Sequence, residues 1–301
     1  MTKEVIERKG IGHPDTICDS LAECLANKLK EAYKEQYGKL QHYNVDKVLA
    51  SCGEVNYKKK KMTKPVKIVF SGNATKLKGI KKILKATVEQ VMFLEIDRGL
   101  KYKIFNHISY CSPDLTSNYE KKKSNDTSFS VGSPLTKNEK LVLAMGEYIE
   151  IFTQELSEVG SDYKIMFVNG QITVALALIA KERKHYEYIK SEIKYRLEDY
   201  FSREIKLNTA DTKETCFNTV TGTSLEQGDA GMVGRGNRYN GLITPMRPMT
   251  MEAYYGKNDV THIGRIYQKK AFDLAQKENK KILMVANIGE NIDKPTIIRW
   301  S

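Results

Sequence analysis

The order of helical and strand-like patterns along this chain limits the folds that it can adopt. Isoleucine and leucine recur at every fourth position between Thr16 and Tyr37, which predicts a helix, and Thr16 with Asp19 provides a capping box at its start. The β-branched run at residues 66–70 predicts a strand that ends in a turn. Helical spacing then returns over residues 76–94.

This succession of patterns repeats twice more, less regularly. The later predicted elements are a helix over 139–156, a strand over 172–180, a helix over 186–201, a helix over 263–277 and a strand over 282–288. Such a mixture favours an α+β fold in which helices cover one face of mixed sheets. We therefore expect three pseudo-repeated α/β units with interleaved boundaries and a shortened C-terminal unit, at residues 1–115, 116–222 and 223–301.

The composition is typical of a globular protein without a membrane span. Hydrophobic residues make up 41% of the 301 residues, which is enough apolar material for a sizeable core, and no apolar run approaches the length of a transmembrane helix. The N-terminus lacks the apolar stretch of a signal peptide, so we expect a cytoplasmic protein. The five scattered cysteines include no CxxC pair, which predicts free thiols rather than disulfides or a zinc site.

A net charge of +12 raises the hypothesis that the chain binds nucleic acid. Much of the excess lies in two lysine runs, at residues 58–61 and 121–123, and neither run is interleaved with the aromatic residues on which bases stack. We interpret both runs as solvated loops. A phosphate-rich small substrate accounts for part of the remaining charge, and a nucleic-acid-binding module is the least favoured interpretation.

The first cluster of candidate functional residues precedes the first predicted helix. Gly10 and Gly12 allow close approach of the backbone to a ligand, and the helix N-terminus supplies N–H groups and a partial positive charge. His13 is a candidate phosphate ligand, and Asp15 provides the carboxylate oxygen that Mg²⁺ prefers. The alternative is purely structural, with Asp15 as the helix cap and the glycines in a turn.

A second cluster lies in the glycine-rich stretch 228–238, whose composition is unsuited to a helix interior. It carries one carboxylate, Asp229, which suits a metal ion, and two guanidiniums, Arg235 and Arg238, which suit bidentate phosphate contacts. The spacing matches neither a Walker A nor a Rossmann motif, and a flexible surface loop is the alternative. Lys257, in a later Gly-Lys-Asn sequence, is a weaker candidate for a phosphate ligand.

The sequence shows no arrangement typical of a serine or cysteine nucleophile. The GxSxG motif is absent, and no histidine stands in a recognisable arrangement with serine or cysteine. Such a chain suits a reaction whose nucleophile needs no general base, for example attack by a neutral thioether sulfur. Catalysis would then depend on positioning and on stabilisation of a polyphosphate leaving group.

Three motifs resemble those of archaeal methionine adenosyltransferases, the S-adenosylmethionine synthetases. They are ERKGIGHPDTICD at 7–19, NDTSFSVG at 125–132 and the block from VTGTS to GKN at 220–258. The resemblance implies a pseudo-threefold fold and a homodimer with active sites at the subunit interface. It also implies that the sulfur of methionine attacks the ribose C5′ of ATP and displaces triphosphate, which is then cleaved, with Mg²⁺ and often K⁺ as cofactors.

The same resemblance implies a role for each candidate residue. His13 would hold the triphosphate and the leaving oxygen, and Asp15 would hold Mg²⁺. ATP and methionine would be bound by Glu7, Glu54, Asp126, Asp229 and Arg238. The residues predicted to act with His13 in catalysis are Arg235 and Lys257.

Several departures from the family pattern leave alternatives open. Asn169 and Gln171 flank a glycine where a lysine is expected before a strand, and Cys111 lies where a substrate-loop glutamine is expected. The chain is also shorter than family members. One alternative is an ATP-binding homologue with a different acceptor, and another is a weakly active or inactive partner in a dimer. If the lysine is missing, Lys164 or a cation of the partner subunit would have to fill its place.

Overall fold

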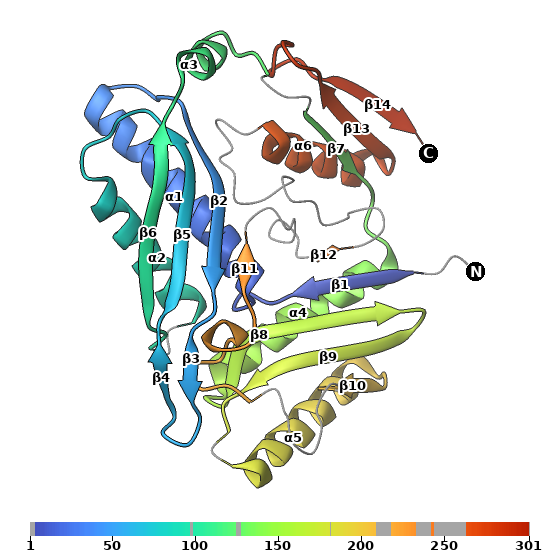
Figure 1. Ribbon diagram of the computed structural model, residues 1–301. Coiled ribbons are helices and arrows are strands. Elements are labelled where there is room, and N and C mark those ends of the chain that lie inside the picture. Colours follow the sequence, from blue (N-terminus) through green and yellow to red (C-terminus); the bar gives the residue numbers. More distant parts are fainter. Residues whose placement is uncertain are drawn as a thin grey trace.

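The computed structural model describes residues 4–96, 99–124, 128–180, 182–208, 218–232, 242–243 and 263–300. Within these ranges the strands form three main sheets, and helices cover one face of each sheet (Figure 1). A separate two-stranded ribbon consists of β3 (Glu54–Asn56) and β4 (Lys61–Lys64). The α+β class predicted from the sequence is therefore confirmed. No helix of the described ranges combines the length and the apolar character that crossing a membrane requires.

The first sheet has the strand order β11-β2-β5-β6 and packs against α1 (Pro14–Tyr37) and α2 (Ile80–Glu95). The apolar stripe predicted for the first helix, including Ile17 and Leu21, is buried in this core. The short helix α3 (Pro113–Glu120) follows the last strand. The strands of the sheet are β2 (Tyr43–Ser51), β5 (Val66–Ala74), β6 (Tyr102–Tyr110) and β11 (Gly231–Met232).

The second sheet has the strand order β10-β9-β8-β1-β12 and packs against α4 (Lys137–Glu155) and α5 (Arg183–Phe201). Its N-terminal strand β1 pairs antiparallel with β8, and this register places Lys9 opposite Lys164. The strands are β1 (Val5–Lys9), β8 (Val159–Val168), β9 (Gln171–Leu178), β10 (Ile205–Leu207) and β12 (Leu242–Ile243).

The third sheet has the strand order β14-β13-β7 and packs against α6 (Ile263–Glu278). Its strands are β7 (Ser128–Gly132), β13 (Lys281–Ala286) and β14 (Thr296–Trp300). Both β1 and β7 join sheets whose other strands come from later parts of the chain. The predicted domain boundaries and the pseudo-repeat remain predictions.

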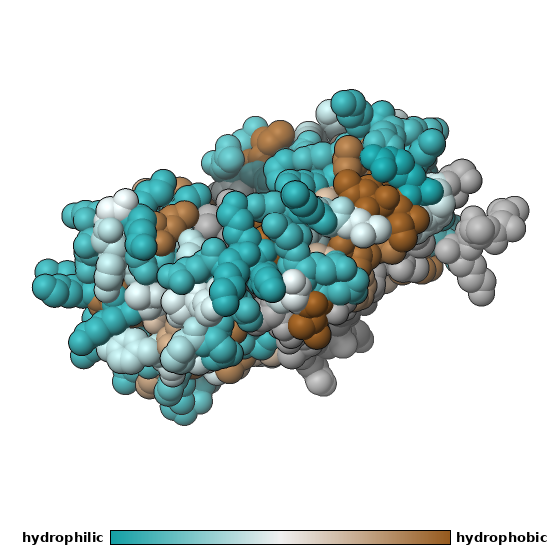
Figure 2. Space-filling model, turned by 90° about the horizontal axis from the view of Figure 1, so that it is seen from above, coloured by the Kyte–Doolittle hydropathy of each residue, from teal (hydrophilic) through white to brown (hydrophobic). Residues whose placement is uncertain are grey.

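The open face of the first sheet carries a row of apolar side chains. Met232, Leu49, Val69 and Phe105 lie side by side on β11, β2, β5 and β6, because the strand registers pair each of them with the next. Leu49 and Phe105 are 41% and 40% exposed. Viewed from above, the molecular surface is largely hydrophilic and its hydrophobic residues gather in separate patches (Figure 2).

The start of the first helix differs from the prediction. The helix begins at Pro14 with His13 as its N-cap residue, so the capping box predicted from Thr16 and Asp19 is wrong. Proline is favoured in the first turn because its φ is already helical and its missing N–H is not needed there. A capping box is instead present at α4, between Thr136 and Glu139.

Candidate active site

The turn between β1 and α1 lies directly against β8. The N–H of Gly10 donates to the carbonyl of Tyr163 (2.7 Å), and the N–H of Gly12 donates to the carbonyl of Ser161 (2.9 Å). A Cβ at either glycine would collide with Tyr163 or Ser161. The sequence suggested that these glycines make room for a ligand, whereas in the structure they make room for β8. This packing holds the N-terminus of α1 beside the second sheet.

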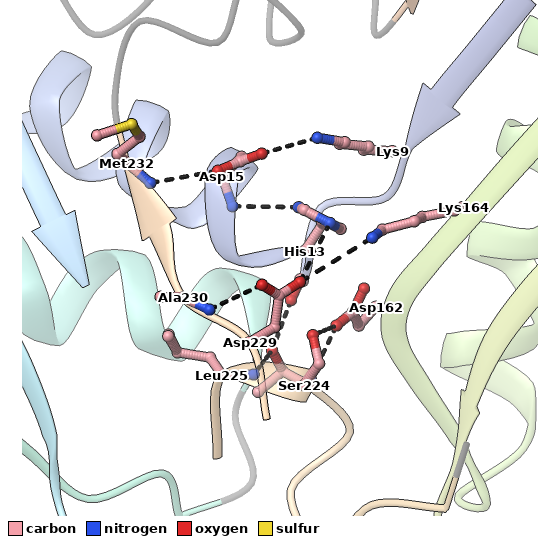
Figure 3. A network of polar contacts seen from close by, with 12 residues as sticks. Lys9, His13, Asp15, Asp162, Lys164, Ser224, Leu225, Asp229, Ala230 and Met232 are labelled. Atoms are coloured by element: carbon pink, nitrogen blue, oxygen red, sulfur yellow. Dashed lines mark hydrogen bonds and ion pairs between the residues drawn. The ribbon is translucent and has the colours of Figure 1, made fainter. Parts of the chain in front are cut away.

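His13 is buried at this N-terminus and is electrically neutral. Its Nδ1 accepts the N–H of Asp15 (3.1 Å), so the neutral ring carries its proton on Nε2. Burial, with the nearby charges of Lys9 and Lys164, lowers the pKa of His13 to about 2. Nε2 has no hydrogen-bond partner among the described residues and lies 4.0 Å from Oδ2 of Asp229 (Figure 3). The ring therefore offers a ligand one N–H donor without carrying a charge.

Asp15 lies in the first turn of α1, and both of its carboxylate oxygens have partners. Lys9 donates from Nζ to Oδ2 (2.7 Å), and the backbone N–H of Met232 donates to Oδ1 (3.2 Å) (Figure 3). The structural alternative, in which Asp15 caps the helix, is wrong because His13 occupies the N-cap position. The carboxylate instead connects β1, α1 and β11.

Asp229 approaches the site from a turn that follows the 3₁₀ helix η1 (Ser224–Glu226). Its N–H donates to the carbonyl of Ser224 (3.2 Å), and its Oδ1 accepts the N–H of Ala230 (2.8 Å). The other oxygen, Oδ2, lies 4.0 Å from Nζ of Lys164 (Figure 3). The turn thus holds Asp229 with one carboxylate oxygen directed at His13 and Lys164.

Asp162 supports this turn, and the sequence analysis did not identify it. Its Oδ2 accepts both the N–H (2.8 Å) and the hydroxyl (2.5 Å) of Ser224, so it connects β8 to the segment that carries Asp229. Burial raises the pKa of Asp162 to about 6, although the hydrogen bonds from Ser224 act in the opposite direction. A single aspartate two positions before Lys164 gives no signal in the sequence, because its role depends on contacts with a distant segment.

Lys164 lies in the cluster around His13. The segment 169–171, where a lysine was expected from the family pattern, lies elsewhere on the sheet. Residues 169–170 form the hairpin turn between β8 and β9, and this turn pairs with Glu4, just before the start of β1. The cluster around His13 is at the other end of β1, where Lys9 faces Lys164 across the strands. Residues 169–171 therefore lie away from the cluster, and Lys164 contributes a cation to it; the absence of a lysine at 169–171 remains a departure from the family pattern.

Glu7 and Glu54 differ in their relation to this cluster. Glu7 lies on β1, and its Oε1 is 3.9 Å from Nζ of Lys9, so it borders the cluster. Glu54 lies on β3 and forms an ion pair with Lys64 on β4. The residues on either side of Glu54 contact the segment that precedes Asp229. The N–H of Gly53 donates to the carbonyl of Leu225, and the N–H of Val55 donates to the side-chain oxygen of Gln227. Its predicted role in methionine binding remains a prediction.

Cys111 lies at the end of the first sheet near α3, away from the N-terminus of α1 (Figure 1). Its sulfur is 2.8 Å from Nδ1 of His42 and 3.5 Å from Oδ1 of Asn73. Burial raises the pKa of Cys111 to about 11, so the group is a neutral thiol. These contacts give Cys111 a local packing role.

Four predicted site residues lie outside the described residues. They are Asp126, Arg235, Arg238 and Lys257. Their assignments to substrate binding and catalysis remain predictions.

The donor set of the cluster suits Mg²⁺ bound together with phosphates. The described residues contain no group of three or more His, Cys, Asp or Glu side chains that could hold a metal ion alone. Mg²⁺ is usually bound by one or two carboxylates with water and substrate phosphates, and Asp15 and Asp229 provide such oxygens. With His13 and two lysines beside them, these residues can bind an anionic polyphosphate and its metal ion.

Comparison with known proteins agrees with this chemistry. The S-adenosylmethionine synthetase (AdoMet synthetase) family pattern matches residues 1–301. The S-adenosylmethionine synthase of Thermoplasma acidophilum is 38% identical over 334 residues, which cover 98% of this chain and 84% of the relative. That of Methanococcus vannielii is 37% identical over 345 residues, with the same coverage. The chain is thus shorter than these relatives, and because the alignments exceed its 301 residues, part of the difference lies within the aligned region.

The fold also has a counterpart among solved structures. The structure of an unusual S-adenosylmethionine synthetase from Campylobacter jejuni superposes with a TM-score of 0.68 at 13% sequence identity. The similarity covers 99% of this chain and 80% of that one, and at this identity it supports the fold alone. The full-length family match and the relatives above decide the assignment: the chain belongs to the S-adenosylmethionine synthetase family, which makes S-adenosylmethionine from ATP and methionine.

Proposed function

We propose that this protein makes S-adenosylmethionine at the cluster around His13, with the triphosphate of ATP bound between β1, β8 and the N-terminus of α1. The observation that carries this proposal is the neutral, buried His13, whose Nε2–H is unpaired among the described residues and which is flanked by two lysines from adjacent strands. A polyphosphate is the ligand that such donors fit best. The methionine sulfur then attacks C5′, and the triphosphate leaves.

His13 acts on the oxygen that leaves C5′. Its Nε2–H donates a hydrogen bond to this oxygen, and the bond strengthens as negative charge builds on the oxygen. Because the pKa of His13 is far below physiological pH, the ring is neutral and donates this hydrogen bond without carrying a charge. The N-terminus of α1 adds its partial positive charge at the same point.

Lys164 binds the triphosphate from β8. Its Nζ faces the same Asp229 oxygen as Nε2 of His13, at 4.0 Å in both cases. The ammonium is therefore directed toward the space that the histidine faces. Lysine acts here as a point charge for phosphate oxygens, and its effect is largest when the leaving oxygen carries most charge.

We assign Mg²⁺ to Asp15 and Asp229. When bound there together with phosphate oxygens, Mg²⁺ would neutralise part of the charge of the triphosphate. Asp162 and Ser224 position Asp229 for this contact through their hydrogen bonds. The use of K⁺ stays a prediction to which no residue is assigned.

The open face of the first sheet supports a homodimer. The apolar row formed by Met232, Leu49, Val69 and Phe105 is continuous with the site, because the backbone N–H of Met232 donates to Asp15. Contiguous exposed apolar patches on soluble proteins mark interaction surfaces. A second copy seated on this row would lie next to Asp15, as an active site at a subunit interface requires.

The free thiols of the protein suit a reducing compartment. The described residues include four unpaired cysteines, Cys18, Cys24, Cys52 and Cys111. Disulfides are rare in the cytosol and common in oxidising compartments. We accordingly place this enzyme in the cytoplasm.

The experiment that tests the function is an assay of purified protein with ATP, methionine and Mg²⁺, with products resolved by mass spectrometry. S-adenosylmethionine, phosphate and diphosphate are expected in equal amounts. Phosphate and diphosphate without S-adenosylmethionine would refute the proposal in favour of an ATP-binding homologue with another acceptor. Unchanged ATP would refute it in favour of an inactive dimer partner. The segment at 169–171 lends these alternatives little support, because it lies in a hairpin turn beside Glu4, at the far end of β1 from His13.

A further inference from the structure

The ion pair between Lys9 and Asp15 occupies the carboxylate that the proposed function assigns to Mg²⁺. Nζ of Lys9 is 2.7 Å from Oδ2 of Asp15, and the side chains are 7% and 10% exposed. The other oxygen of Asp15 accepts the backbone N–H of Met232. Binding of a metal ion to Asp15 therefore requires that one of these partners be displaced. The lysine side chain is flexible, whereas the N–H of Met232 belongs to the paired strand β11.

Lys9 is also half of a cross-strand pair of lysines. The register of β1 and β8 places Lys9 directly opposite Lys164 on the open face of the sheet. Side chains in such positions lie within reach of each other, and like charges there are destabilising unless counter-charges are present. Here Lys9 pairs closely with Asp15 and Lys164 faces Asp229 (Figure 3), and Glu7 lies at a longer distance from Lys9. A triphosphate placed between the two strands would be the anion nearest to both ammonium groups.

We propose that Lys9 changes partner during the reaction cycle, from Asp15 in the free protein to the triphosphate in the complex with ATP and Mg²⁺. The proposal rests on the proposed function and adds a residue to it that the family motifs do not assign. A buried ammonium needs a counter-charge at every stage, because an unpaired charge in a poorly hydrated site is costly. When Asp15 turns to the metal ion, Lys9 loses its close counter-charge at 2.7 Å, while Glu7 lies farther away at 3.9 Å, and the triphosphate takes the place of Asp15.

This exchange couples the binding of Mg²⁺ to that of the triphosphate. Lys9 competes with a metal ion for Oδ2 of Asp15 in the free protein, so it weakens metal binding when no phosphate is present. Once the triphosphate is bound, Lys9 is drawn to the phosphate and the same oxygen becomes accessible. The two ligands therefore bind better together than their separate affinities suggest.

Replacement of Lys9 by methionine separates the two effects, because they have opposite signs. In Lys9→Met, Asp15 loses its competing ammonium, so Mn²⁺, as a stand-in for Mg²⁺, should bind the nucleotide-free protein about tenfold more tightly. Tripolyphosphate in excess EDTA should bind about tenfold more weakly, the lower end for loss of a hydrogen bond between charged groups. Electron paramagnetic resonance of free Mn²⁺ and calorimetric titration of tripolyphosphate measure the two affinities.

Two further variants control for fold and for charge. Lys9→Gln is a second neutral variant that keeps a hydrogen-bond donor, and it should show the same tighter binding of Mn²⁺ and weaker binding of tripolyphosphate. Circular dichroism establishes which of the two variants is folded. Lys206→Met removes a charge from β10, an exposed position in the same sheet, and neither affinity should change. A change in both affinities there would show a general charge effect and overturn the proposal.

The remaining outcomes separate failure of the exchange from failure of the metal assignment. Unchanged or weaker Mn²⁺ binding in the neutral Lys9 variants overturns the exchange, and weaker binding of both ligands would indicate a purely structural role. If Asp15→Asn removes Mn²⁺ binding while Lys9→Met does not tighten it, only the exchange fails. If Asp15→Asn leaves Mn²⁺ binding unchanged, the metal assignment in the proposed function fails as well.

Discussion

Replacing Lys164 with methionine removes one charge from β8 while keeping a side chain of similar length. Loss of one preorganised donor to a developing charge commonly costs about 3–4 kcal/mol, or roughly a hundredfold to a thousandfold in rate. The Lys164 side chain is 47% exposed and 4.0 Å from Asp229, so solvent screens part of its charge. We therefore expect the lower end, about a hundredfold loss in kcat, with a smaller change in the KM for ATP.

Lysines introduced at the hairpin turn test whether position, rather than charge alone, matters. Asn169 follows Lys164 by five residues along β8, which corresponds to about 17 Å at the rise of an antiparallel strand. A lysine side chain cannot span that distance. Asn169→Lys and Gln171→Lys should therefore leave the turnover of the wild type unchanged and should not restore Lys164→Met.

The assay is steady-state formation of S-adenosylmethionine over a range of ATP concentrations at saturating methionine and Mg²⁺, quantified by chromatography, which gives kcat and the KM for ATP. Circular dichroism and thermal unfolding of each variant separate loss of catalysis from loss of fold. If Lys164→Met stays within threefold of the wild type, Lys164 has no role in leaving-group stabilisation. If Asn169→Lys restores the Lys164→Met enzyme, the placement of the hairpin outside the site is wrong.

Three further predictions concern Asp15, the sheet surface and His13. Asp15→Asn should lower turnover well over tenfold in a folded protein, because a metal-held charge contributes several kcal/mol; full activity of this variant, or of the wild type in excess EDTA, would contradict the metal role. Phe105→Glu should give a monomer in light scattering, whereas Phe93→Glu, at a 67% exposed position on α2, should not; dimers in both variants would refute the interface. His13 is neutral in the folded protein, with a pKa of about 2, whereas in the unfolded protein it protonates near its usual pKa of 6.5. Because only the unfolded state takes up a proton as the pH falls, the free energy of unfolding of the wild type should decrease by up to about 2 kcal/mol between pH 7 and pH 5. His13→Asn, which keeps an N-cap side chain, should lack this loss in urea unfolding; a constant difference between the two proteins would contradict the lowered pKa. The comparison cancels the contribution of Asp162, whose raised pKa has the opposite sign.

Elements with a strong apolar period could be predicted from the sequence. The helix predicted at 186–201 is α5 (Arg183–Phe201), and its stripe of Ile189, Ile193 and Leu197 is buried. The strand predicted at 172–180 is β9, whose apolar run is buried on the helix side and at its end. In both elements one face packs against the core, so the spacing of apolar residues in the sequence matches the side chains that are buried.

The strand that contributes most to the site, β8, was not predicted. Its first half contains Gly160, Ser161 and Asp162, which interrupt the apolar alternation. A glycine is needed at 160 because a Cβ there would collide with Gly222, and Ser161 packs closely against Gly12. Contacts with segments far away in the sequence determined these residues, so a local pattern could not reveal the strand.

The position of Lys164 in the cluster around His13 follows from the register between β1 and β8. Ile6, Ile165 and Phe167 face the core under α4 and α5, which leaves Lys9 and Lys164 on the open face. A shift of one residue would move every side chain of a strand to the opposite face and bury the lysines beneath the helices. Burial of these apolar side chains therefore holds the two lysines opposite each other. The proposed triphosphate site between these lysines therefore depends on packing on the far side of the sheet, which no motif around either lysine records.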